Sequence, residues 1–235
     1  MNNIEEKFKE GLIFSIDKPY RWTSSDVIRK VRSILRYQYK IKKIKAGHAG
    51  TLDPLATGVL VVCIGRATKQ AEEIQAGEKE YIASLRFGAT TPCCDLEKPV
   101  DAVFPYEHIT RETLEIALKK FTGMIEQIPP LFSAKMINGT RAYEFARKGE
   151  NVEIKSSMVY IKEIEIVEFD LPDVVLRIVC SKGTYIRSIA RDLGFELQSG
   201  AHLTNLCRTR SGDFLLNQSL KIDDLENFFK NFETK

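Results

Sequence analysis

The stretch Gly47-His48-Ala49-Gly50-Thr51-Leu52-Asp53-Pro54-Leu55-Ala56-Thr57-Gly58 runs directly into the apolar segment 59–64. Glycines punctuate it, and its one carboxylate is Asp53. An aspartate side chain has an ordinary pKa of about 3.9, so at neutral pH it is already an anion and can attack carbon without a general base. The stretch therefore predicts a loop that presents a nucleophilic carboxylate just before an apolar strand.

Asp53 followed by Pro54 also has a structural interpretation. Aspartate is a favoured N-cap, and proline is favoured at the first position of a helix. On the dipeptide alone, a helix start is the commoner interpretation. The whole twelve-residue stretch favours the loop, because it resembles a specific signature.

The stretch resembles the signature of the bacterial tRNA pseudouridine-55 synthases, Gly-His-x-Gly-x-Leu-Asp-Pro-x-Ala-x-Gly, at every fixed position. Further blocks resemble that family in the same order between about Gly11 and Gly212: Asp17-Lys18-Pro19 with Thr23-Ser24, Lys79-Glu80-Tyr81, Gln127-Ile128-Pro129-Pro130 with Ser133-Ala134, Arg141-Ala142-Tyr143-Glu144, and Cys180-Ser181-Lys182-Gly183-Thr184-Tyr185-Ile186-Arg187. Several ordered blocks at compatible spacing make a chance match very improbable.

The resemblance implies an α+β pseudouridine-synthase fold, in which a central mixed sheet flanked by helices forms an RNA-binding cleft. It also implies isomerisation of uridine to pseudouridine in the T-arm loop of tRNA, without a cofactor. By residue, it implies that Asp53 attacks the ribose C1′ or the uracil ring and that His48 lies against a flipped-out nucleotide. It also implies that Tyr81 stacks on the uracil and, as a second catalytic residue, takes the C5 proton after the new bond forms. Of the two points of attack we favour C1′.

The later blocks supply three more candidates. The resemblance pairs Arg187 with Asp53, places Tyr185 beside the base and packs Leu206 near the uracil. Tyr185 and Arg187 share a face if this segment is extended. The alternatives are a packed aromatic for Tyr185, a charge at a helix start for Arg187 and an ordinary core residue for Leu206.

Basic residues flank the signature on both sides and suit the phosphates of an RNA. The candidates for RNA contact here are Lys18, Lys43, Lys45 and Arg66. The segment 129–152 interleaves cations with aromatics and resembles the family's RNA-gripping insertion, with Arg141, Tyr143 and Arg147 as candidates. As alternatives, basic runs are most often solvated faces, and the aromatics of this segment could be one side of a short helix.

Composition is compatible with this interpretation. The chain has 235 residues and a formal net charge of only +3, so charge alone does not demand a nucleic-acid partner. The five cysteines lack zinc-site spacing and indicate reduced thiols, and the three histidines are scattered, so we expect no metal. Neither a signal peptide nor a membrane span is apparent, which predicts a cytoplasmic protein. We expect a monomer that needs no protein partner.

Hydrophobic periodicity predicts mixed elements. Strands are expected at 12–16, 59–64, 81–87, 159–167 (with a register shift) and 174–180, and helices after a cap at Ser24 or Ser25, from Thr110 to Gly123, at 186–198 and at 222–232. Together they predict one catalytic α+β domain over residues 1–235. Only residues 211–235 follow the last matching block, so we expect no further C-terminal RNA-binding domain.

Two departures from the family stand out. Arg21 replaces a usual glycine, so the turn there must adopt negative φ or tolerate strain. Thr91-Pro92-Cys93-Cys94-Asp95 replaces a usual Thr-Asp-Thr-x-Asp. Two rival functions are an RNA-binding or RNA-folding protein without catalysis, and a phosphate-loop enzyme using residues 65–69, whose glycine spacing does not fit.

Overall fold

The computed structural model describes residues 3–133, 135–137, 139–142, 144–145, 150 and 152–234. The chain divides into two compact units, which we call unit 1 (Met1–Glu80 with Cys207–Lys235) and unit 2 (Tyr81–Leu206). The chain passes between them within strands β4 (Lys79–Phe87) and β12 (Ala201–Ser211). This division does not test whether residues 1–235 act as a single domain, which stays a prediction.

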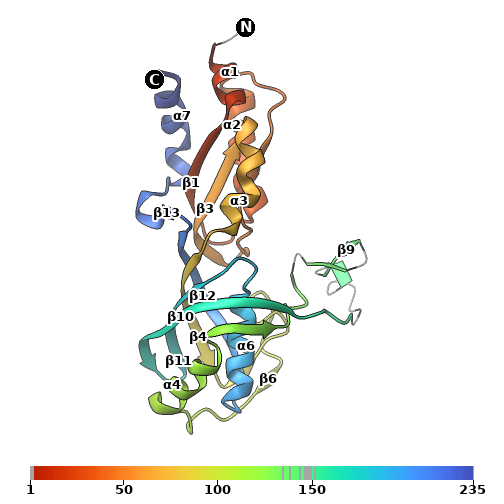
Figure 1. The fold of residues 1–235 in the computed structure, drawn as a ribbon, viewed down its shortest axis with the longest axis vertical. Coiled ribbons are helices and arrows are strands. Elements are labelled where there is room, and N and C mark those ends of the chain that lie inside the picture. The colour runs from red at the N-terminus through yellow and green to blue at the C-terminus, as the bar shows by residue number, and fades with distance from the viewer. Residues whose placement is uncertain are drawn as a thin grey trace. The chain divides into compact units, whose positions relative to one another are not determined.

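Unit 1 contains the signature stretch. Its elements are α1 (Asn3–Glu10), β1 (Leu12–Lys18), α2 (Ser24–Tyr37), β2 (Ala46–His48), β3 (Ala56–Ile64), η1 (Gly65–Gln70), α3 (Ala71–Ala76), β13 (Phe214–Leu215), η2 (Leu216–Gln218), η3 (Ile222–Asp224) and α7 (Leu225–Thr234) (Figure 1). Its strand order is β1-β3-β12, with β2 on β3 and β13 on β12. Strands β1 and β3 are antiparallel, with Leu12 opposite Ile64 and Lys18 opposite Gly58.

Strand β3 is the centre of the unit 1 core. Residues 59–64 are all fully buried, as the apolar segment predicts. Val59 and Val61 pack with Ile74 and Phe214 on one face of β3. Because side chains alternate along a strand, the even-numbered residues of 59–64 point to the opposite face. A strand buried on both faces needs a continuous apolar run rather than an alternating one.

Helix α7 closes another part of unit 1 through aromatic contacts. Its Phe229 meets Phe8 of α1 and Phe14 of β1 edge to face, at centroid distances of 5.5 and 5.8 Å. Edge-to-face pairs at such distances stabilise beyond the area they bury. The C-terminal helix is therefore part of the unit that carries the signature.

Helix α2 begins one or two residues earlier than the sequence predicts. Its N-cap is Thr23, not Ser24 or Ser25, because Thr23 and Asp26 form a reciprocal capping box. Its apolar stripe, Val27, Ile28, Val31, Ile34 and Leu35, is buried as expected.

Unit 2 holds the remaining elements. They are β5 (Ala89–Thr90), β6 (Ala102–Val103), α4 (Arg111–Lys120), β7 (Gly123–Gln127), β8 (Met136–Ile137), β9 (Thr140–Arg141), β10 (Ser157–Asp170), β11 (Asp173–Cys180) and α6 (Ile186–Glu196). Its main strand order is β12-β4-β11-β10-β7. The expected long strand with a register shift is confirmed, since the β10–β11 ladder shifts after Ile161 and after Ile166.

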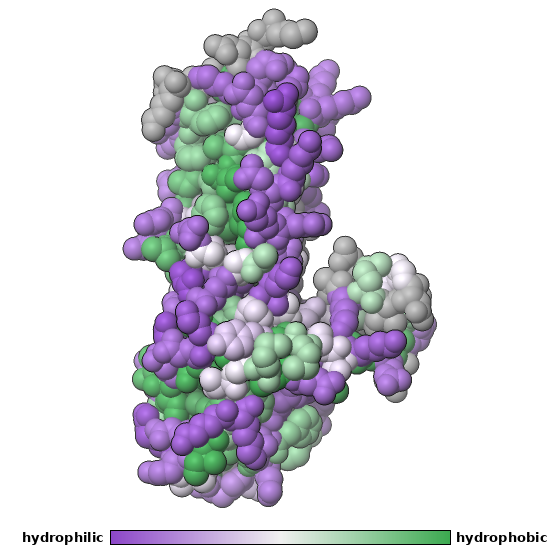
Figure 2. All heavy atoms as spheres, in the orientation of Figure 1, coloured by the Kyte–Doolittle hydropathy of each residue, from purple (hydrophilic) through white to green (hydrophobic). Residues whose placement is uncertain are grey.

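The α+β class predicted from the sequence is confirmed, and each strand and helix expected there has a counterpart. Helices α4 and α6 supply Leu114 and Leu193, both fully buried, to the core of unit 2. Hydrophilic groups cover much of the surface seen in Figure 2, with apolar groups between them. None of the described helices is both long enough and apolar enough to cross a membrane.

Candidate functional site

The signature stretch forms a loop between two strands of unit 1. Strand β2 ends at His48, β3 begins at Ala56, and Ala49 N–H donates to the carbonyl of Val61 over 2.9 Å. Asp53 and Pro54 lie in a turn in which Ala56 N–H donates to the Asp53 carbonyl over 3.1 Å. The helix-start interpretation of Asp-Pro is therefore wrong. The Asp53 residue is half-buried.

The start of α2 holds this loop. The hydroxyl of Ser24, which is 3% exposed, accepts from Leu52 N–H over 2.9 Å and donates to the Leu52 carbonyl over 3.1 Å. The N–H of Arg21 donates to the Pro54 carbonyl over 2.9 Å. Arg21 has φ +65°, so the strained alternative predicted for this departure is the one that occurs. Its backbone thus contacts the residue after Asp53.

The structure corrects the prediction that Lys18 contacts RNA. Its side chain is fully buried, and Nζ donates to the carbonyls of Trp22 over 2.6 Å, Pro19 over 3.0 Å and Pro54 over 3.4 Å. Burial lowers the pKa of Lys18 to about 8, the nearby Asp53 charge opposes this shift, and Arg208 adds to it. An ammonium enclosed in this way cannot reach a phosphate. Lys18 is instead a buried cation that holds the loop through its carbonyls.

Arg208 of β12 is a loop-holding residue that the sequence did not reveal. It is 1% exposed and the largest fully buried side chain. Its guanidinium donates to the carbonyls of Val59 over 2.7 Å, Gly50 over 3.0 Å and Thr51 over 3.5 Å. Hydrogen bonds from a charged donor are about twice as strong as neutral ones. Arg208 therefore holds backbone on both sides of Asp53 through one side chain.

Gly58 makes that arrangement possible. Its φ is +99°, and a Cβ there would stand 2.3 Å from the carbonyl oxygen of Arg208. No side chain fits at that distance, and L-residues avoid that backbone region. The last glycine of the signature thus lets the backbone of β3 approach that of β12 where Arg208 lies.

The surroundings of His48 favour its neutral form. Burial is the main reason its pKa lies below the ordinary value, and the charge of Arg208 adds to the effect. Its Nδ1 is buried and has no hydrogen-bond partner among the residues that the structure describes. A neutral imidazole suits packing against a nucleobase better than it suits contact with phosphate.

Unit 2 carries Arg187, at the start of α6. The residue is 4% exposed, and its Nη atoms donate to the carbonyls of Cys93 over 3.1 Å and Phe132 over 2.8 Å. Its Nε lies 3.6 Å from the buried carboxylate of Asp95. Asp95 is the acid retained in the segment that departs from the family pattern. Arg187 and Asp53 belong to different units, so their pairing stays a prediction.

Tyr185 is the N-cap of α6 and has an extended backbone, but Arg187 already lies within the helix. The extended segment in which the two side chains would share a face therefore does not occur. The amide of buried Gln127 accepts from Tyr185 N–H over 2.8 Å and donates to the Tyr185 carbonyl over 3.1 Å. This two-point contact fixes the backbone beside a half-buried tyrosine. The sequence offered Gln127, just before two prolines, as a signal for this contact. Its partner Tyr185 lies 58 residues further along the chain, so the contact could not be predicted.

Tyr81 and Leu206 are both buried, each 8% exposed, on β4 and β12. For Leu206 this burial agrees with the core interpretation and leaves the substrate interpretation open. The predicted roles of both residues stay predictions.

The other RNA-contact candidates differ in how far the structure describes them. Lys43, Lys45 and Arg66 are exposed in unit 1. Tyr143 and Arg147 lie outside the described residues, and for Arg141 only the backbone of β9 is described. Both interpretations of segment 129–152 therefore stay open.

Across the described ranges, no group of three or more His, Cys, Asp and Glu side chains could hold a metal ion. The five cysteines are free, and burial raises the pKa of Cys94 to about 11, which keeps that thiol protonated. The expectation of a site without metal or cofactor stays a prediction.

Comparison with known proteins identifies the family. Residues 36–186 match the model of the TruB family pseudouridylate synthase N-terminal domain, and residues 187–235 match that of the tRNA pseudouridylate synthase B C-terminal domain. A protein of Phocaeicola vulgatus called tRNA pseudouridine synthase B is 57% identical over 92% of each chain. One of Parabacteroides distasonis with the same name is 56% identical over 95% of each.

Solved structures agree on the fold. The crystal structure of a Cbf5-Nop10-Gar1 complex superposes with a TM-score of 0.73 at 28% identity, over 99% of this chain and 58% of that one. A Cbf5 structure in a Nop10-Cbf5 complex gives 0.68 at 27% identity, over 99% and 58%. The expected pseudouridine-synthase fold, with its mixed central sheet and helices, is confirmed. The chain therefore belongs to the TruB family of pseudouridylate synthases.

Proposed function

We propose that this chain is a tRNA pseudouridine synthase that isomerises one uridine in the T-arm loop of tRNA. Family membership and the shared name of its relatives support this reaction. The observation that carries the proposal is local to unit 1. A half-buried aspartate lies in a loop whose carbonyls are held by two fully buried cations, Lys18 and Arg208.

The reaction rearranges one nucleoside without loss of atoms. The bond from ribose C1′ to N1 of uracil breaks, a bond from C1′ to C5 forms, and the hydrogen on C5 is replaced while N1 gains a proton. No electrons or phosphoryl groups leave, so the reaction requires no cofactor. The target base must first leave its stack, because a protein carboxylate cannot reach C1′ inside a folded arm.

Asp53 is the proposed catalytic nucleophile, at C1′ rather than at the uracil ring. A carboxylate nucleophile of this kind needs no general base to remove a proton. The hydrogen bonds of Lys18 and Arg208 to carbonyls hold the loop before substrate arrives. Preorganised groups of this kind cost no rearrangement during the reaction.

The other proposed site residues contact the flipped nucleotide. His48 lies against it, and Tyr185 and Leu206 border the base. Tyr81 stacks on the uracil and is the proposed acceptor of the C5 proton after the new bond forms. Arg187 pairs with Asp53 and orients it by two-point hydrogen bonding. Asp95, 3.6 Å from the Arg187 guanidinium, then acts through Arg187 as a positioning residue.

Exposed cations provide the proposed grip on RNA. Lys43, Lys45 and Arg66 flank the signature and contact phosphates, and Arg141, Tyr143 and Arg147 belong to the gripping insertion. We propose a monomeric cytoplasmic enzyme that selects the T-arm stem-loop without a protein partner.

Tritium release tests the proposal. A tRNA transcript labelled with tritium at C5 of uridine loses the label when C5 forms its new bond. The native chain should release it, and Asp53→Asn should release none, because the amide is not an anionic nucleophile. Asp213→Asn, an exposed acid in the same unit, is the matched control and should release tritium like the native chain.

Equal release by Asp53→Asn and the native chain would overturn the assignment of the nucleophile. Tight tRNA binding by the native chain with no release at all would favour the rival interpretation, an RNA-binding or RNA-folding protein.

A further inference from the structure

Residues 27–52, which lead into the signature aspartate, carry cations and no carboxylate. The cations are Arg29, Lys30, Arg32, Arg36, Lys40, Lys42, Lys43 and Lys45. Ion pairs join Arg29 to Asp26 and Lys30 to Glu226. The other six have no carboxylate within ion-pair distance among the residues that the structure describes. This run therefore keeps most of its positive charge.

Hydrogen bonds within unit 1 bring the run beside η1. Arg32 Nη2 donates to the Ala46 carbonyl over 2.6 Å, and Gly65 N–H donates to the Lys45 carbonyl over 2.8 Å. The segment after α2 is anchored by Ile41, which is 2% exposed and donates its N–H to the Leu35 carbonyl over 3.1 Å. We call the exposed cations between residues 36 and 69, from the end of α2 through η1, the α2 basic surface. They are Arg36, Lys40, Lys42, Lys43, Lys45, Arg66 and Lys69.

An exposed aromatic lies within this surface. Tyr37 is 65% exposed, and the Arg36 guanidinium lies 5.7 Å from its ring centroid. A large aromatic left in water beside a guanidinium gains little from folding. Both groups can stack on a base or lie along a backbone when RNA is bound.

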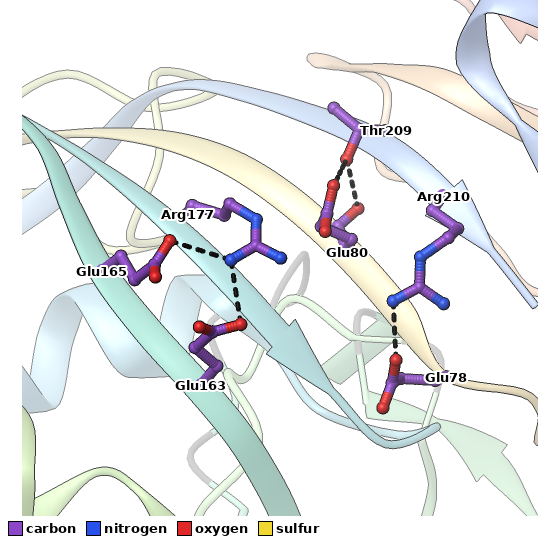
Figure 3. A network of polar contacts seen from close by, with 7 residues as sticks. All are labelled: Glu78, Glu80, Glu163, Glu165, Arg177, Thr209 and Arg210. Carbon is purple, nitrogen blue, oxygen red and sulfur yellow. Dashed lines mark hydrogen bonds and ion pairs between the residues drawn. The ribbon is translucent and has the colours of Figure 1, made fainter.

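Several cations of unit 2 behave differently. Arg86, Lys120 and Arg177 each meet a carboxylate, at 2.7, 2.5 and 2.8 Å. Figure 3 shows Arg177 between Glu163 and Glu165 on neighbouring strands. Their charge is locally neutralised, so they attract phosphate weakly. The cations of the α2 basic surface have no carboxylate partner among the described residues, so they are available to a polyanion.

The surface extends well away from the candidate nucleophile. Ser24, the first residue of α2, bonds to Leu52 beside Asp53, and α2 then runs for 14 residues, or about 21 Å at 1.5 Å per residue. Cations near the far end of α2 cannot touch the flipped nucleotide.

We propose that the α2 basic surface binds the phosphate backbone of the substrate tRNA at positions remote from the target uridine, with Tyr37 stacking on an exposed base or ribose. The inference rests on the proposed function for the identity of the RNA. It adds to Lys43, Lys45 and Arg66 a second group, Arg36, Lys40, Lys42 and Lys69, together with Tyr37.

The test compares two variants that lose the same charge. One carries Arg36→Gln, Lys40→Gln, Lys42→Gln and Lys69→Gln. Its control carries Arg86→Gln, Arg111→Gln, Lys120→Gln and Arg177→Gln, all from exposed ion pairs of unit 2. Dissociation constants for full-length tRNA are measured from 50 to 200 mM salt.

The surface variant should bind at least about tenfold more weakly at 50 mM salt. The slope of log affinity against log salt should shrink by about 0.9 for each phosphate that the variant no longer neutralises. The control should stay near the native slope. Unchanged binding by the surface variant would overturn the proposal. Equal weakening of both variants would also overturn it, because loss of net charge alone would then explain the weaker binding.

Tyr37→Ala separates binding from any misfolding of the multiple variant. It should weaken tRNA binding about fivefold or more, since one stacked base contributes about 1–3 kcal/mol. No change would overturn the stacking part. Tritium release by the native chain distinguishes the two proposals. If the native chain releases no tritium but the salt slopes are as expected, the proposed function is wrong and the binding surface is still supported.

Discussion

The cations that hold the signature loop and the arginines of the sheet region in Figure 3 have opposite kinds of partner. Lys18 and Arg208 have almost no exposed surface and donate to backbone carbonyls. Arg177 and Arg210 are partly exposed and meet carboxylates, Glu163 with Glu165 and Glu78 respectively. Lys18 and Arg208 therefore keep their positive charge near the loop that carries Asp53. The charges of Arg177 and Arg210 are neutralised by the adjacent carboxylates.

The difference separates two uses of positive charge. A buried cation without an acidic partner is costly, so the fold retains it only where many contacts hold it. Here those contacts are the carbonyls of the loop that carries Asp53. Exposed ion pairs contribute about 0–1 kcal/mol each and fix little. The following predictions test whether the two regions differ as much as their environments imply.

Arg208→Met should give the largest effect. It removes the donors to three carbonyls and leaves them buried, which should lower the free energy of unfolding by about 3 kcal/mol or more. The rate of pseudouridine formation by the folded fraction should also fall, because the loop loses the hydrogen bonds that hold it. Denaturant unfolding and single-turnover assays measure the two effects.

Arg208→Lys is the matched control for that prediction. It keeps the charge but not the planar fork, so it should recover part of the stability and less of the activity. Full activity in both variants would show that the loop does not depend on this side chain.

The Lys18 environment predicts a specific dependence of stability on pH. Its folded pKa is about 8 against 10.5 unfolded, so the unfolded chain binds more protons between these values. Stability should therefore rise with pH in that window, by at most on the order of 3 kcal/mol for this group. Lys18→Met should remove this contribution. Identical pH profiles for the variant and the native chain from pH 8 to 10.5 would contradict a buried, charged Lys18.

Arg177→Gln should give the smallest effect. The hydrogen bond from Arg177 holds the pKa of Glu163 below its usual value, but both side chains are partly exposed to water. The free energy of unfolding, measured with denaturant, should change little, and less still at high salt, because water and ions screen the pair. A destabilisation as large as that of Arg208→Met would remove the distinction between the two regions.

The sequence predicted the elements whose burial leaves a regular pattern. Strand β3 follows from its apolar run, and α2 from its helical stripe. It missed β12 as a strand because His202, Arg208 and Ser211, all buried, interrupt the apolar alternation. It also missed α1, whose short charged sequence is held by the packing of Phe8 rather than by pattern.

The site shows the same limit. Asp53 and its loop were predicted because their residues are contiguous and resemble a family signature. Lys18 was misassigned because a lysine near other charged residues is ordinarily exposed, and its burial depends on three carbonyls that fold around it. Arg208 and Gln127 act on backbone about 150 and 60 residues away, which no local pattern encodes. Long-range contacts of this kind appear only in the folded chain.

The proposed reaction requires a flipped nucleotide to meet Asp53 in the loop held by Lys18 and Arg208. A structure of the chain with a T-arm stem-loop carrying 5-fluorouridine at the target position tests this most directly. The ribose C1′ of that nucleotide should lie in contact with, or bonded to, the Asp53 carboxylate, with Lys18 and Arg208 still on the loop carbonyls. A target nucleotide bound away from Asp53 would contradict the account.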